Sequence, residues 1–96
     1  MPSIELIREN LIPVFGRYKV KRAILFGSYA NGTATDRSDI DIFVDSGLRG
    51  LMFFGLLEDV TDALQKPVDL IDQSQIDENS KVMDEINRTG VLIYGE

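Results

Sequence analysis

The chain has 96 residues, 44% of them hydrophobic and 27% charged, so we expect one ordinary globular domain over residues 1–96 rather than a disordered segment. It contains neither cysteine nor histidine, which excludes disulfides, thiolate or imidazole metal sites and Ser-His catalysis. The net charge of −6 argues against a nucleic-acid partner, because such binding depends mainly on Lys and Arg that neutralise phosphates.

Hydropathy points to a cytoplasmic location. No apolar run approaches the roughly 18 residues that a membrane span requires. The first residues, MPSIELIREN, also lack the basic and then apolar order of a signal peptide. We therefore expect no membrane partner.

The first half of the chain predicts a helix followed by two strands. Residues 3–15 have helical periodicity with Ser3 as the N-cap, and Pro13 is expected to kink or end this helix near Ile12. Residues 22–26 are an apolar run without a polar face, which favours a strand covered on both sides. After a Gly-Ser turn, residues 29–37 predict one helical turn and then a loop.

The second predicted strand, residues 39–44, carries acids on one side. Asp39, Asp41 and Phe43 alternate with three aliphatic residues, so both carboxylates point to the same face. At about 4 Å, such a pair repels by roughly 1–4 kcal/mol, depending on the effective dielectric constant. A divalent cation with oxygen ligands, Mg²⁺ or Mn²⁺, would remove that cost.

The second half continues the alternation of helices and strands. A helix to about residue 65 is indicated by an apolar stripe at Phe53, Leu56, Leu57, Val60 and Leu64. Met52 and Phe54 lie off this stripe; we interpret them as core, and the alternative is an exposed patch for a partner. Residues 68–72, after Pro67, predict a third strand. A last helix is expected over about 76–88 with Val82, Met83 and Ile86 as its apolar side, then a Gly90 cap and an edge strand at 91–94.

These elements predict an α/β (α+β) class, a small mixed sheet flanked by helices. If the Gly27-Ser28 turn and Asp39/Asp41 share a site, the first two strands are antiparallel. Asp69, at the start of the third strand, joins them if that strand is parallel to the second. Backbone and hydroxyl donors for phosphate, with three acids for metal, are the groups that phosphoryl or nucleotidyl transfer requires.

The residues GSYANG at 27–32 and SDID at 38–41 resemble the GSxARG…SDxD signature of minimal nucleotidyltransferases in the DNA polymerase beta-like superfamily. The resemblance extends over nearly the whole chain and implies the nucleotidyltransferase fold. It implies that Asp39, Asp41 and Asp69 bind Mg²⁺ and are catalytic, with Asp69 also activating the acceptor hydroxyl. Gly27, Ser28 and Ser38 would belong to the nucleotide-binding residues. Arg37 is either a phosphate contact or a solvated charge.

Small members of this family are commonly antitoxins paired with an all-helical HEPN-domain toxin, and some transfer AMP from ATP to a toxin tyrosine. The resemblance therefore implies ATP as substrate and such a toxin as partner, with a homo-oligomer left open. Asn31 departs from the signature, which has Arg at that position, and loss of a positive charge beside a triphosphate weakens binding. A non-catalytic antitoxin that neutralises by docking is thus the alternative, and transfer to RNA or a small molecule is a third.

Overall fold

The computed structural model describes residues 2–95. In chain order its elements are α1 (Ile4–Arg17), β1 (Arg22–Phe26), α2 (Ser28–Asn31), β2 (Ile40–Asp45), α3 (Leu51–Leu64), β3 (Val68–Asp72), the 3-10 turn η1 (Gln73–Gln75), α4 (Lys81–Thr89) and β4 (Val91–Gly95). The strands form one sheet in the order β3-β2-β1-β4. Within the described residues, no helix is long and apolar enough to cross a bilayer.

The sheet is mixed, as predicted. Strand β1 is antiparallel to β2 and to the edge strand β4, whereas β2 and β3 are parallel. Parallel neighbours require a crossover connection, which α3 provides between β2 and β3. The predicted strand directions, including the edge position of the last strand, are confirmed.

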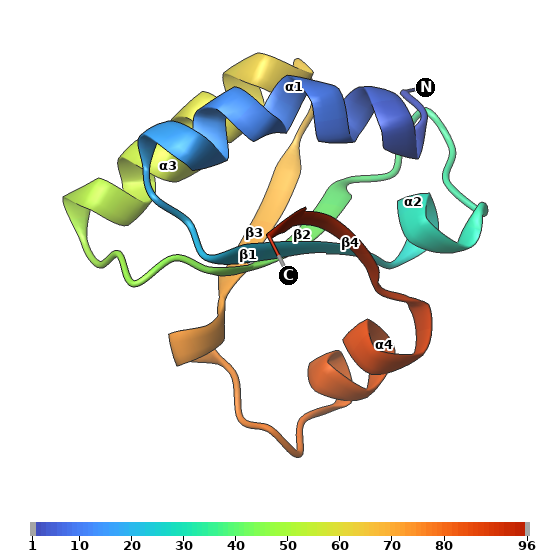
Figure 1. Ribbon diagram of the computed structural model, residues 1–96. Coiled ribbons are helices and arrows are strands. Elements are labelled where there is room, and N and C mark those ends of the chain that lie inside the picture. The colour runs from blue at the N-terminus through green and yellow to red at the C-terminus, as the bar shows by residue number, and fades with distance from the viewer. Residues whose placement is uncertain (1, 96) are drawn as a thin grey trace.

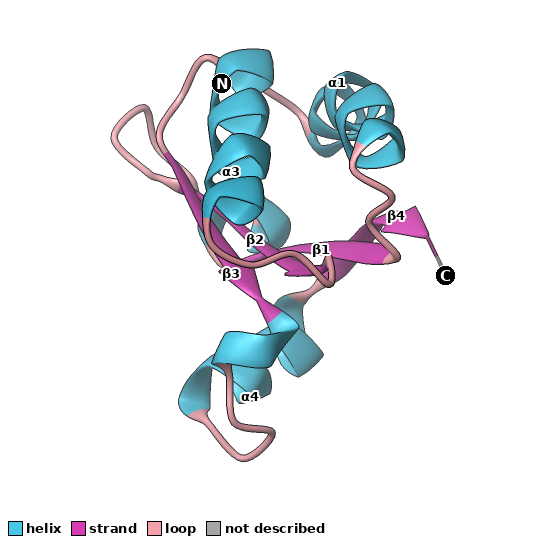
Figure 2. Ribbon diagram, turned by 90° about the vertical axis from the view of Figure 1, so that its left-hand side faces the viewer, coloured by secondary structure: helices cyan, strands magenta, loops and turns pink. Residues whose placement is uncertain are grey.

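Helices cover both faces of the sheet. Helices α1 and α3 lie on one face, and α4 with η1 lies on the other (Figures 1 and 2). The larger hydrophobic cluster lies under α1 and α3 and includes Leu11, Leu25, Ile42 and Leu56. A smaller cluster of buried Phe26, Phe43 and Ile86 forms under α4. Strand β1 contributes to both clusters, which explains why its sequence has no polar face.

Helix α1 begins as predicted but ends later. Ser3 caps it, since the Leu6 N–H donates to Ser3 Oγ at 3.2 Å. Of the kink or end expected near Ile12, the end is wrong, because the helix continues through Pro13 to Arg17. Pro13 lies on the exposed side of the helix, where water can hydrate the carbonyl that loses its partner. The buried Val14 and Phe15 hold the last turn against the core.

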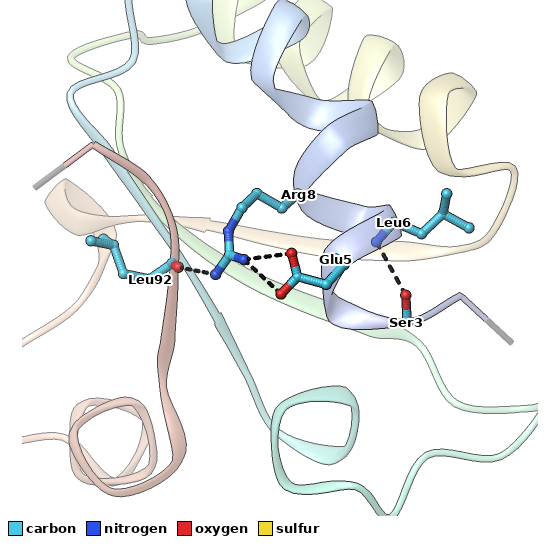
Figure 3. A network of polar contacts seen from close by, with 5 residues as sticks. All are labelled: Ser3, Glu5, Leu6, Arg8 and Leu92. Atoms are coloured by element: carbon cyan, nitrogen blue, oxygen red, sulfur yellow. Dashed lines mark hydrogen bonds and ion pairs between the residues drawn. The ribbon is translucent and has the colours of Figure 1, made fainter.

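Arg8 fastens α1 to the edge of the sheet (Figure 3). Its guanidinium donates to the Leu92 carbonyl of β4 at 2.9 Å and to both Glu5 carboxylate oxygens at 3.0 and 3.1 Å. An edge strand presents unpaired backbone groups that invite further pairing. The contact with Arg8 occupies one of them.

Helix α3 has the predicted core stripe, but the favoured interpretation of Met52 and Phe54 is wrong. Their side chains are 58% and 66% exposed, and Leu51 is 88% exposed. Neighbours of Phe53 on a helix lie about 100° to either side of it, so they leave the core when the stripe through Leu56 faces the sheet. The alternative, an exposed apolar patch, describes the structure.

The segment after β3 also differs from the prediction. Residues 73–75 form η1, and α4 starts at Lys81, capped by Ser80, rather than near residue 76. Asp72 causes this early turn: its carboxylate accepts hydrogen bonds from the N–H and hydroxyl of both Ser46 and Ser74. Gly90 ends α4 as predicted, but with φ −63°, outside the left-handed region.

Candidate functional site

Three carboxylates occupy one end of the sheet, on the face that α4 covers. Asp41 in β2 is the register partner of Asp69 in the parallel strand β3, so both side chains project from the same face. Asp39 lies two residues before Asp41, on the same side, just ahead of β2. Asp39 and Asp69 are exposed, and Asp41 is half-buried. The structure thus places the three acids chosen from the sequence at one end of the sheet, near enough for the charges of Asp39 and Asp69 to act on Asp41.

The environment of Asp41 is unfavourable for a bare carboxylate. Burial, followed by the charges of Asp69, Glu85 and Asp39, raises the pKa of Asp41 from 3.8 to about 6. Nearby negative charges and loss of solvent both disfavour the ionised form. A cation at this position would reverse the effect, because opposite charge favours the carboxylate.

The donor set fits a hard divalent cation. All candidate ligands are carboxylate oxygens, which Mg²⁺ and Mn²⁺ prefer, and the chain has no His or Cys. Within residues 2–95, no three acidic side chains stand close enough together to form a finished metal cluster. Asp39 and Asp69 are exposed, so their side chains can rotate toward Asp41 without leaving a packed environment.

Gly27 is fitted closely to Asp41. It follows the last residue of β1, Phe26, which is the register partner of Asp41. Its backbone has φ +71° and ψ −148°, a combination that residues with a β-carbon rarely adopt. A β-carbon at this position would collide with Asp41 Oδ2. Helix α2 then begins at Ser28, so the Gly-Ser turn lies directly beside the acids.

Helix α4 supplies two residues that the sequence reasoning missed. The Gly27 N–H donates to Thr89 Oγ1 at 3.3 Å, and Thr89 Oγ1 donates to the Glu85 carbonyl at 2.8 Å. The Glu85 carboxylate is one of the charges that act on Asp41. Their spacing of four residues places them on one helix face. No local pattern shows where that face docks.

The connecting loop holds the remaining candidates. Arg37 is exposed, and its backbone N–H donates to Thr35 Oγ1 at 3.3 Å. Ser38 Oγ accepts from the Thr35 N–H at 2.9 Å. Asn31 Oδ1 accepts from the Thr33 N–H at 3.1 Å and from the Thr33 hydroxyl at 2.6 Å. The side chains of Ser38 and Asn31 therefore stabilise the loop that leads to β2.

Known proteins are similar to this chain in sequence, and solved structures are similar to it in fold. Residues 9–96 match the family described as polymerase beta, nucleotidyltransferase. A candidate protein adenylyltransferase of Methanocaldococcus jannaschii is 35% identical over 77 residues, which cover 77% of this chain and 82% of that protein. A second such protein of this organism is 38% identical over 74 residues and is covered to 86%.

Solved structures of related proteins have a similar fold. A toxin–antitoxin complex determined with AMP-PNP has a chain that is 29% identical, with a TM-score of 0.76 over 93% of this chain and 73% of that one. A complex of the tri-AMPylated Shewanella oneidensis HEPN toxin with its MNT antitoxin has a chain that is 25% identical, with a TM-score of 0.71 over 98% and 74%. The mixed sheet flanked by helices is thus the nucleotidyltransferase fold. The chain belongs to the polymerase beta nucleotidyltransferase family, among its minimal nucleotidyltransferases.

Proposed function

We propose that this chain transfers AMP from ATP to a hydroxyl of a partner protein, a tyrosine of a HEPN-type toxin, and so acts as its antitoxin. The observation that carries the proposal is the acid face: the half-buried Asp41 feels the charges of Asp39 and Asp69 and lies against Gly27, which has no β-carbon. The AMPylated HEPN toxin in the Shewanella oneidensis complex supports AMP as the transferred group and a HEPN toxin as the protein that accepts it.

The three aspartates would hold Mg²⁺ or Mn²⁺. When bound, the cation supplies positive charge to the phosphates and to the oxygen atoms that gain charge in the transition state. Asp69 is exposed and in register with Asp41, so it can take the proton of the acceptor hydroxyl as a general base. The acceptor oxygen then bonds to the α-phosphorus while the bond to the β-phosphate breaks, and diphosphate leaves.

The Gly27-Ser28 turn would hold the triphosphate. Helix α2 begins at Ser28. The N–H groups of Ala30 and Asn31 donate to the Gly27 carbonyl, so those of Ser28 and Tyr29 are the candidates to contact a phosphate. The missing β-carbon of Gly27 leaves room for Asp41 Oδ2, so the phosphates and the carboxylates can approach each other. Arg37 and Ser38, in the loop before Asp39, are proposed as further phosphate contacts.

Transfer from α-labelled ATP tests this assignment. Purified chain, Mg²⁺ and a co-purified HEPN-type partner are compared for wild type, Asp41→Asn and the control Asp62→Asn, which changes an exposed acid on α3. We expect label on the partner with wild type and with Asp62→Asn, and at least about a 100-fold loss with Asp41→Asn. Unchanged transfer by Asp41→Asn would remove Asp41 from the metal site.

A second candidate function is neutralisation by docking alone. It is favoured by the exposed Leu51, Met52 and Phe54 and by Asn31 at the position where the family signature has Arg. The two functions separate in cells that express the toxin together with a variant in which all three aspartates are Asn. Catalytic neutralisation requires that protection is lost together with the label, whereas docking predicts that protection is retained.

A further inference from the structure

The start of α3 forms an apolar surface that the proposed chemistry does not use. Its residues are Leu51, Met52 and Phe54, which we call the α3 patch, and all three are more than half exposed. Beside the patch lies a groove of about 480 Å³, lined in part by Leu48, Phe53 and Leu57. Large exposed apolar side chains next to a hollow are typical of a protein interaction site.

The groove carries a positive charge, although the net charge of the chain is negative. Arg49 is the one charged residue that lines the groove. Its guanidinium forms no ion pair within residues 2–95. Helix α3 begins at Leu51 with Gly50 as its N-cap. Within the described residues no side chain caps it and its first turn contains no acid, so neither offsets the positive end of its dipole. The groove therefore favours a carboxylate flanked by large apolar side chains.

We infer that the α3 patch and the groove with Arg49 are the docking surface for the HEPN-type partner, which presents apolar side chains around an Asp or Glu. This inference rests on the proposed function. A second copy of this chain is a poorer occupant, because each copy has a net charge of −6 and the groove lining contains no carboxylate to pair with Arg49. In a two-fold dimer through this groove the complementary charge would be missing, which favours a different protein as the occupant.

The position of the surface defines what it contributes. The α3 patch follows the end of β2 at Asp45. Asp41 lies near the opposite end of that strand, its start, which is the end closer to α2 (Figure 1). Docking at the patch thus leaves the acid face open to the acceptor side chain. The surface should supply affinity for the partner without altering the chemical step or the binding of ATP.

Titration calorimetry with the co-purified HEPN-type partner tests the inference. The variants are Phe54→Asp, Arg49→Glu and the control Leu6→Asp, which places the same charge on a half-exposed leucine of α1. We expect at least about tenfold weaker binding for Phe54→Asp and Arg49→Glu, and wild-type affinity for Leu6→Asp. Thermal unfolding of the free chains shows that each variant is folded.

Steady-state transfer separates this inference from the proposed function. With labelled ATP, the patch variants should raise the KM for the partner while kcat and the KM for ATP stay at wild-type values. Binding by Phe54→Asp within twofold of wild type would overturn the docking surface even if AMP transfer is observed. A wild-type dimer in sedimentation that Phe54→Asp dissociates, with unchanged partner affinity, would assign the patch to a second copy instead. Normal docking without transfer would overturn the chemistry and leave the surface in place.

Discussion

Replacing Gly27 by Ala should damage the site far more than it damages the fold. The backbone at Gly27 (φ +71°, ψ −148°) costs a residue with a β-carbon roughly 1–3 kcal/mol. For a chain of this size, that corresponds to a fall in Tm of about 4–24 °C. The new methyl group would also collide with Asp41 Oδ2 and push that carboxylate away from its position. A displacement of about 1 Å at a reacting group costs on the order of 100-fold in rate.

Gly32→Ala is the matched control. Gly32 also has a positive φ, +83°, but a β-carbon there meets nothing within 4 Å. The substitution Gly32→Ala should lower the free energy of unfolding by about 1–2 kcal/mol and leave the rate of AMP transfer near the wild-type value. The assay is label transfer from α-labelled ATP at a temperature at which calorimetry shows all three proteins folded. If Gly27→Ala transfers AMP as fast as Gly32→Ala, the contact between the turn and Asp41 has no role in activity.

Three further changes have defined outcomes. Burial alone would raise the pKa of Asp72, but its hydrogen bonds with two serines hold that pKa below the ordinary value. Asp72→Asn should therefore lower the free energy of unfolding, measured in urea, by about 2–4 kcal/mol at pH 7. The difference from wild type should shrink as the pH falls below about 4, because the wild-type carboxylate is then protonated. Thr89→Val removes the hydroxyl that accepts from the Gly27 N–H, so it should speed hydrogen exchange at that amide and raise the KM for ATP. Thr89→Ser should keep both at wild-type values. Equal exchange rates in all three proteins would refute a role for this hydrogen bond. Asn31→Arg should tighten ATP binding severalfold in calorimetry, and weaker binding would show that the Asn31 contacts with the loop matter more.

The candidate site could be placed on the fold from the sequence because its signals are local. The alternation around Asp41 fixes which face of β2 carries acids, and the short distance in sequence from the Gly27 turn limits how far apart the two can lie. Asp69 required one further assumption, a parallel third strand, which the crossover through α3 satisfies. Periodicity and turn residues were sufficient for these elements.

Other features depend on tertiary packing and were not predictable from local signals. Glu85 and Thr89 reach the site because buried Ile86 places α4 against the sheet, and no motif encodes that docking. Pro13 continues a helix because it faces water, which a rule about proline alone does not include. The exposure of Phe54 follows from the rotation of α3 about its axis, and an apolar residue gives the same signal in a core or in an interface.

The intact mass of the partner is the most direct test of the central claim. The HEPN-type partner is incubated with ATP, Mg²⁺ and either wild-type chain or the double variant Asp39→Asn/Asp41→Asn, and then weighed by mass spectrometry. We expect the mass to increase by one or more AMP groups with wild type only, and fragmentation should place them on tyrosine. A partner that binds wild type stably but never gains AMP would contradict the claim that this acid face transfers nucleotides.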